Sequence, residues 1–127
     1  MRPIARSEAP FTDAWGYSRA IRIGDRIEVA GTSAIHPDGS VHSPGDPYEQ
    51  TRYILGIIER ALAEVGSCFE HVIRTRAFLT RIDDFREVGR AHRETFGATL
   101  PVSTCVGGAV LLDPQLLVEI EASAVIL

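Results

Sequence analysis

The sequence lacks most of the features that assign a chemistry directly. It has only two cysteines, Cys68 and Cys105, and they form no CxxC pair. We therefore expect reduced, mostly buried thiols and no disulfide framework. No apolar run reaches the roughly 18 residues that a membrane span needs, and no apolar segment follows the N-terminal residues. We expect no membrane contact, no signal peptide and a cytoplasmic location.

An excess of positive charge is also missing. The formal net charge is −4 and the isoelectric point is about 5.5. Proteins that bind nucleic acid carry a basic patch or stripe, and none is evident here. We therefore expect no nucleic-acid partner.

The common catalytic motifs are absent as well. No GxGxxG, GxxxxGK[ST], GxSxG, SxxK or HExxH pattern occurs, and the four histidines lack the spacing of metal ligands. We expect neither a metal nor an organic cofactor. Judged on these residues alone, the chain is an α+β domain without an evident chemistry.

The length and composition fit one domain. The chain has 127 residues, of which 45% are hydrophobic and 24% charged. A chain of this size buries roughly 65–70% of its unfolded surface, which is enough for a single core. We expect one domain over residues 1–127.

Turn and cap residues divide the chain into regular elements. Gly24 and Asp25 separate two β-rich runs and predict a hairpin. Asp46 and Pro47 predict the start of a helix, and Gly66 predicts its end. The expected elements are strands over 20–23 and 26–30, a helix from 46 to 66, a strand over 72–79, a helix from 83 to 97, and strands over 102–110 and 116–126, with one further strand left open between the hairpin and the first helix.

The last strand alternates cleanly. Val118, Ile120 and Ala122 share one face, and Glu119 and Glu121 the other. We expect one mixed sheet with two helices on one face, the second packing through Phe85, Val88, His92 and Phe96. The uncovered face would carry Thr75, Ala77 or Phe78, Cys105 and Ala109 beside the two glutamates. Such a mixed face is typical of a subunit interface.

An ordered series of short segments resembles one known family. The segments are Tyr17-Ser18-Arg19-Ala20, Ile27 to Gly31, Gln50, Gly66, Asp84-Phe85, Pro101 to Val106, and Val118 to Ala122 with Ala124. They span nearly the whole chain and are similar to the RidA (YjgF) family. The resemblance implies a chorismate-mutase-like fold and a homotrimer, in which three sheets form an inner barrel and small-molecule clefts lie between subunits.

The resemblance also implies a chemistry. Members of the family hydrolyse reactive enamines and imines to keto acids and ammonia without a cofactor. Carried over by position, Glu119 would position the attacking water, while Tyr17, Gly31 and Cys105 would line the cleft. Two positions depart from the pattern. Ser103 stands where the deaminases have an arginine that binds the substrate carboxylate, and His92 stands where a tyrosine is usual.

Each of these residues also has a plain structural interpretation. Glu119 fits a solvated or paired carboxylate, Ser103 a strand hydroxyl, Cys105 a packed small residue, His92 an interior histidine and Tyr17 a cover over the sheet edge. Which arginine, if any, replaces the missing one stays open among Arg19, Arg74 and Arg76.

Three functional hypotheses follow. The first is hydrolytic deamination of an enamine or imine whose substrate differs from the usual one, with Ser103, His92, Tyr17, Gly31 and Cys105 as ligand-binding residues and Glu119 as the catalytic residue. The second is a non-catalytic trimer that binds or senses a small metabolite. The third, ribonuclease activity or inhibition of translation, is the least compatible with an acidic chain.

Overall fold

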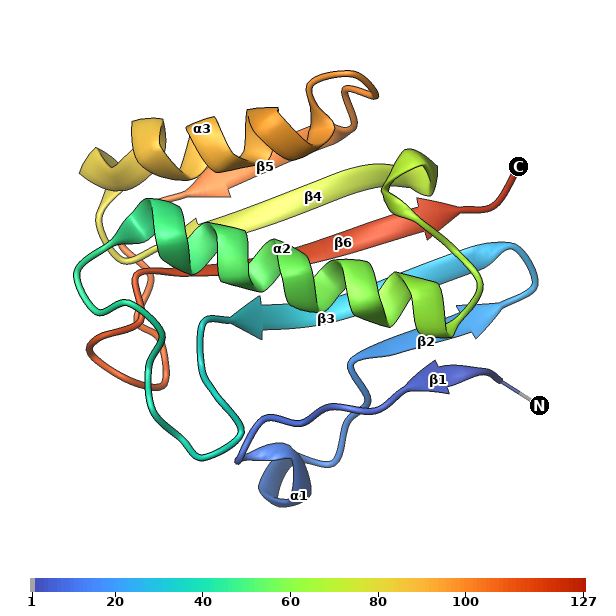
Figure 1. Ribbon diagram of the computed structural model, residues 1–127, viewed down its shortest axis with the longest axis horizontal. Coiled ribbons are helices and arrows are strands. Elements are labelled where there is room, and N and C mark those ends of the chain that lie inside the picture. The colour runs from blue at the N-terminus through green and yellow to red at the C-terminus, as the bar shows by residue number, and fades with distance from the viewer. Residues whose placement is uncertain (1) are drawn as a thin grey trace.

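The computed structural model describes residues 2–127 and shows helices packed on a single sheet (Figure 1). In chain order, the elements are β1 (Ile4–Ala5), α1 (Thr12–Trp15), β2 (Ala20–Ile23), β3 (Arg26–Ser33), α2 (Pro47–Glu64), β4 (Val72–Leu79), α3 (Phe85–Phe96), β5 (Val102–Val106) and β6 (Val118–Val125). Short 3₁₀ turns precede β4 (Phe69–His71) and α3 (Ile82–Asp84). The α+β class predicted from the sequence is confirmed.

The six strands form a mixed sheet in the order β1-β2-β3-β6-β4-β5. β4 and β5 are parallel, while the other neighbouring pairs are antiparallel. The last strand in sequence, β6, therefore lies in the middle of the sheet, between β3 and β4. β5 is an edge strand.

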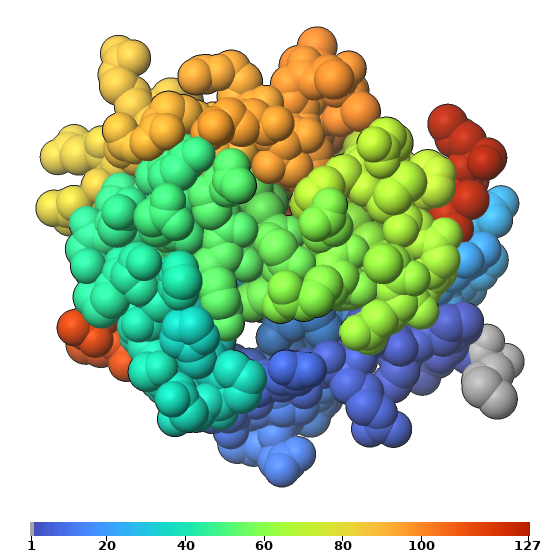
Figure 2. Space-filling model, viewed as in Figure 1, coloured from blue at the N-terminus to red at the C-terminus, as the bar shows by residue number. Residues whose placement is uncertain are grey.

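Helices α2 and α3 lie side by side on one face of the sheet (Figure 1). The Asp46 carboxylate accepts a hydrogen bond from the Glu49 backbone N–H at 3.0 Å, so the predicted cap and the Pro47 start of α2 are confirmed. The space-filling view shows the two helices covering the centre of this face, with the N-terminal segment beside α2 (Figure 2).

The core lies between the helices and the sheet. Buried apolar side chains come from both long helices and from the central strands β3, β6 and β4, and they include Ile27, Val29, Ile54, Ile58, Leu62, Leu79, Val88, Phe96, Val118 and Ile120. The predicted alternation of β6 is confirmed: Ile120 and Ala122 are buried, while Glu119 and Glu121 are only partly covered. We call the side of the sheet away from the helices, which carries Glu119 and Glu121, the open face.

The predicted composition of the open face is partly wrong. Ala77 pairs with Ile120 on β6 and with Cys105 on β5, and this row faces the helices. Thr75 is fully buried on the same side. Phe78 is the residue of β4 that joins Glu119 on the open face. Strand alternation forbids Ala77 and Phe78 from sharing a face, and helix burial selects Ala77.

Four local features differ from the sequence prediction. The helical turn α1 and the two-residue strand β1 were not expected. The strand left open before α2 is reduced to a single bridge between Ile35 and Val41. Phe85, which was expected to face the core, is 56% exposed. It is the first residue of α3, and the buried residues of this helix begin at Val88.

Within residues 2–127, no helix combines the length and the apolar character needed to cross a membrane.

Candidate functional site

A buried arginine organises one group of candidate residues. The Arg19 side chain is only 6% exposed and directs both terminal nitrogens at uncharged oxygens. Nη1 donates to the Gly31 carbonyl at 2.7 Å and to Thr32 Oγ1 at 3.2 Å, and Nη2 donates to Ser7 Oγ at 3.0 Å and to the Tyr17 hydroxyl at 3.1 Å. Arg19 thereby brings Tyr17 and Gly31, two of the predicted ligand-binding residues, into one cluster.

Glu119 completes this cluster from the open face. A β-carbon added to Gly31 would lie 3.1 Å from the Glu119 carboxyl carbon and 3.2 Å from Oε1. The backbone of Gly31 is therefore in close contact with the carboxylate. Only a glycine leaves this much space, so the position of Gly31 has a physical reason.

The environment of Glu119 suits a proton-transfer group. Burial raises the pKa of Glu119, the neighbouring Arg19 charge opposes the rise, and Glu121 adds to it. The ion pairs found among residues 2–127 do not include Glu119. A half-buried carboxylate with a raised pKa is a common form of general base or acid.

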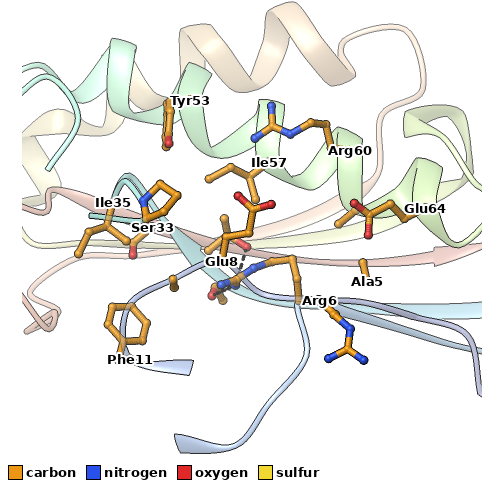
Figure 3. A pocket seen from close by; sticks show the side chains of 16 residues that line it. Ala5, Arg6, Glu8, Phe11, Ser33, Ile35, Tyr53, Ile57, Arg60 and Glu64 are labelled. Carbon is orange, nitrogen blue, oxygen red and sulfur yellow. Dashed lines mark hydrogen bonds between the residues drawn. The ribbon is translucent and has the colours of Figure 1, made fainter. Parts of the chain in front are cut away.

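A cavity of about 70 Å³ lies on the helix side of this cluster, with Arg19 and Gly31 among its lining residues. Figure 3 shows Tyr53, Ile57 and Arg60 of α2 on one side of it and Ile35 and Phe11 on the other. Its volume holds a few water molecules, whereas small-molecule pockets usually span about 300–1,000 Å³. We therefore do not assign it as the ligand site.

The remaining candidates form a second group beside β5. Thr75 Oγ1 lies 2.7 Å from Ser103 Oγ and 2.7 Å from His92 Nε2. Burial lowers the pKa of His92, which favours the neutral imidazole. Cys105 packs against the core, and burial raises the pKa of its thiol, as the interpretation of a packed residue requires.

The two groups lie on opposite faces of one subunit. Ser103 is in register with Thr75 and shares its helix-facing side, although its own side chain is exposed at the sheet edge. Glu119 is in register with Phe78 and lies on the open face. A single chain therefore does not bring Glu119 and Ser103 into one pocket.

The three alternative arginines differ in availability. All four hydrogen bonds of the Arg19 terminal nitrogens go to protein oxygens, so a ligand carboxylate would have to displace them. Arg76 forms an ion pair with Glu121 at 2.6 Å. Arg74 lines a shallow groove on the open face that also contains Arg76, Glu121 and Glu28.

Sequence inspection missed Thr75 as a site residue. The sequence prediction placed Thr75 on the uncovered face, and only the β4–β5 register and the contact with α3 show that it connects Ser103 to His92. Within residues 2–127, no three His, Cys, Asp or Glu side chains are grouped as a metal site would require.

Comparison with known proteins agrees with this fold. Residues 7–126 match the family described as Endoribonuclease L-PSP, and the chain belongs to that family. The predicted relationship to RidA and YjgF proteins is confirmed, because the similar solved structures include members of the YjgF/YER057c/UK114 family.

The similarity extends over almost the whole chain. The crystal structure of Rv2704 from Mycobacterium tuberculosis, a YjgF/YER057c/UK114 family member, is 42% identical, covers 99% of this chain and 100% of that one, and superposes with a TM-score of 0.89. An uncharacterized protein of Streptomyces coelicolor is 41% identical over 119 residues, which are 94% of this chain and 88% of the relative. A RutC family protein of Pyrococcus abyssi is 32% identical over 108 residues, 85% of this chain and 84% of the relative.

Proposed function

We propose that the protein hydrolyses a small enamine or imine to a carbonyl compound and ammonia. The observation that carries this proposal is the half-buried Glu119 carboxylate, which contacts the Gly31 backbone and has a raised pKa. The site would be a cleft between two subunits of a homotrimer, with Tyr17, Gly31 and Glu119 from one subunit and His92, Ser103 and Cys105 from the next. The position of the two groups on opposite faces of one chain supports a cleft shared between copies.

In the proposed reaction, Glu119 accepts a proton from a water molecule while the water oxygen attacks the imine carbon. Glu119 returns this proton to the nitrogen, which gives the carbinolamine. The carbinolamine hydroxyl proton then passes to the nitrogen by way of Glu119, the C–N bond breaks to release ammonia, and the C=O bond forms. A raised carboxyl pKa suits both steps, because the same group takes a proton at neutral pH and returns it readily. Gly31 and Tyr17 would hold the ligand by their backbone and hydroxyl groups.

The expected substrate differs from a 2-imino acid. A charge-assisted hydrogen bond contributes about 1.5–3 kcal/mol, and a bidentate arginine more. Ser103 supplies at most neutral hydrogen bonds, and Arg19 and Arg76 are already engaged with protein groups. Without a free arginine at position 103, a substrate carboxylate would bind at least tens of times more weakly.

The test is ammonia release from imines generated in the assay mixture, both 2-iminobutyrate and its uncharged amide. We expect the amide to be hydrolysed faster, and 2-iminobutyrate to be hydrolysed far more slowly than by an arginine-bearing family member. Glu119→Gln should lower the rate by about 10²-fold or more. Glu121→Gln, on the same strand and the same face, is the matched control and should stay within about twofold.

Two outcomes would contradict the proposal. Equal rates for wild type and Glu119→Gln would remove Glu119 from the reaction. Binding of the imines without any ammonia release would favour the alternative hypothesis, a non-catalytic trimer that binds a small molecule.

A further inference from the structure

Three hydrogen-bonding side chains from three separate elements form a continuous row. Ser103 on β5, Thr75 on β4 and His92 on α3 are joined by two contacts of 2.7 Å. The parallel register of β4 and β5 places Thr75 directly beside Ser103, and α3 lies over this edge of the sheet. The row runs from an exposed hydroxyl, through a threonine with 0% exposure, to a half-buried imidazole.

The buried threonine forces the row to be polarised. Its hydroxyl carries one proton and can donate in only one of its two contacts. In one state, Ser103 donates to Thr75 and Thr75 donates to His92 Nε2, which leaves the Ser103 lone pairs facing outwards. In the other, His92 donates to Thr75, Thr75 donates to Ser103, and the Ser103 proton faces outwards.

The imidazole end of the row is held in its neutral form, which has one ring nitrogen free to accept a hydrogen bond. His92 is driven towards the neutral form by burial alone, and no charged side chain of α2, α3, β4 or β5 among residues 2–127 contributes to the shift of its pKa. Phe96 packs against the ring, with ring centroids 4.8 Å apart.

We propose that Ser103, Thr75 and His92 form a proton relay that removes a proton from an uncharged N–H group of the ligand. The ligand N–H proton passes to Ser103 Oγ, the Ser103 proton to Thr75 Oγ1, and the Thr75 proton to His92 Nε2, which becomes an imidazolium. No heavy atom has to move, and the reverse transfers restore the row.

This inference rests on the proposed function and names its substrate class, an enamine that bears a free N–H and carries no carboxylate towards Ser103. An enamine becomes a hydrolysable imine when its nitrogen loses a proton and its terminal carbon gains one. The relay would take the nitrogen proton in the same step in which a protonated Glu119 from the neighbouring copy supplies the carbon proton, so that no nitrogen anion forms. Glu119 would then be a carboxylate, the form that activates water.

The first experiment follows the His92 imidazole by NMR in the intact protein and needs no substrate. We expect Thr75→Val to lower the pKa of His92 further, because the imidazolium loses its hydrogen-bond acceptor. Ser103→Ala should lower it as well, although Ser103 does not contact the ring, and Thr75→Ser should restore the wild-type titration. An unchanged His92 pKa in Ser103→Ala would overturn the relay.

The second experiment separates tautomerisation from hydrolysis. Thr75→Val should slow the consumption of an uncharged enamine at least tenfold more than it slows the hydrolysis of a preformed imine, with Thr75→Ser restoring the enamine rate. Rates in H₂O and D₂O mixtures should report several moving protons in wild type and fewer in Thr75→Val. Thermal melting and mass measurements establish that each variant is folded.

The two proposals fail in different ways. Loss of all hydrolysis in Glu119→Gln, with unchanged enamine rates in Thr75→Val, would remove the relay and keep the proposed function. A wild type that releases no ammonia from any imine would remove the proposed function, and the NMR titrations would then decide the relay alone.

Discussion

The Gln50 side chain accepts a hydrogen bond from the Leu117 backbone N–H at 2.9 Å, across 67 residues of sequence. Its amide nitrogen donates to the Gln115 carbonyl at 3.0 Å, and the residue is fully buried. One side chain at the start of α2 therefore fixes the segment that leads into β6. Glu119 is the second residue of β6 and lies two residues after Leu117, so the same hydrogen bond helps to fix the position of Glu119 along the strand.

Replacing Gln50 tests this connection. Gln50→Leu would leave the partly buried Leu117 N–H and Gln115 carbonyl without their side-chain partner, so we expect a loss of about 1–3 kcal/mol in the free energy of unfolding. Urea denaturation gives the value. Glu59→Gln, at an exposed position of the same helix, should change it by less than about 0.5 kcal/mol.

Gly31→Ala should separate activity from stability. The new methyl group would press on the Glu119 carboxylate at about 3.1 Å and displace it by a few tenths of an ångström. We expect imine hydrolysis to fall roughly tenfold with little change in thermal stability. In the control, Gly56→Ala, the nearest atom is 3.9 Å away, and the variant should gain about 0.5–1 kcal/mol and keep full activity. Full activity in Gly31→Ala would show that the contact is not needed.

Glu119→Gln should raise stability at neutral pH. Burial raises the Glu119 pKa in the folded state, so the folded protein binds more protons than the unfolded chain and loses stability as pH rises through the two pKa values. Glutamine removes this loss. The difference in melting temperature should be present at pH 7 and should disappear below the ordinary carboxyl pKa of 4.5. A variant that is less stable at pH 7 would show that the carboxylate is stabilising.

Ser103→Arg should change the preferred substrate. The exposed position at the sheet edge has room for a long side chain, and a guanidinium there would bind a carboxylate through two hydrogen bonds. We expect hydrolysis of 2-iminobutyrate to increase at least tenfold, or about 1.4 kcal/mol, and added Glu119→Gln to remove most of the gain. Thr104→Arg, on the same strand but the opposite face, should gain nothing. An unchanged rate in Ser103→Arg would mean that position 103 does not face the ligand.

The oligomeric state can be measured by light scattering. We expect a mass of about three times 13.9 kDa at micromolar concentration. Val106→Arg would place a charge on the open face beside Phe78 and should reduce the mass to that of one chain. Glu59→Arg on the helix side should leave it unchanged. A wild-type monomer would remove the shared cleft.

Much of the fold could be predicted from local patterns. The Asp46 cap, the alternation of β6 and the bounds of β4 depend on neighbouring residues, and the structure confirms them. The faces of β4 and β5 could not be assigned, because the run around Ala77 and Phe78 is apolar on both sides. Only the pairing with β6 decides it.

The candidate residues also divide into those that the sequence predicts and those that depend on strand pairing. Position and resemblance selected Tyr17, Gly31 and Glu119, which the structure brings together around Arg19. Position and resemblance did not indicate that Thr75 contacts both Ser103 and His92. These contacts depend on the register of β4 and β5, which are separated in sequence by the whole of α3.

Alternation along β6 limits how this family can change in length. Ile120 and Glu119 are adjacent on one strand, so an insertion within β6 would move a core side chain to the open face and a carboxylate into the core. The segment from Gly107 to Gln115 ends at the Gln50 anchor and is free of this constraint. Insertions and deletions among relatives should therefore accumulate in that segment, while the core stays unchanged.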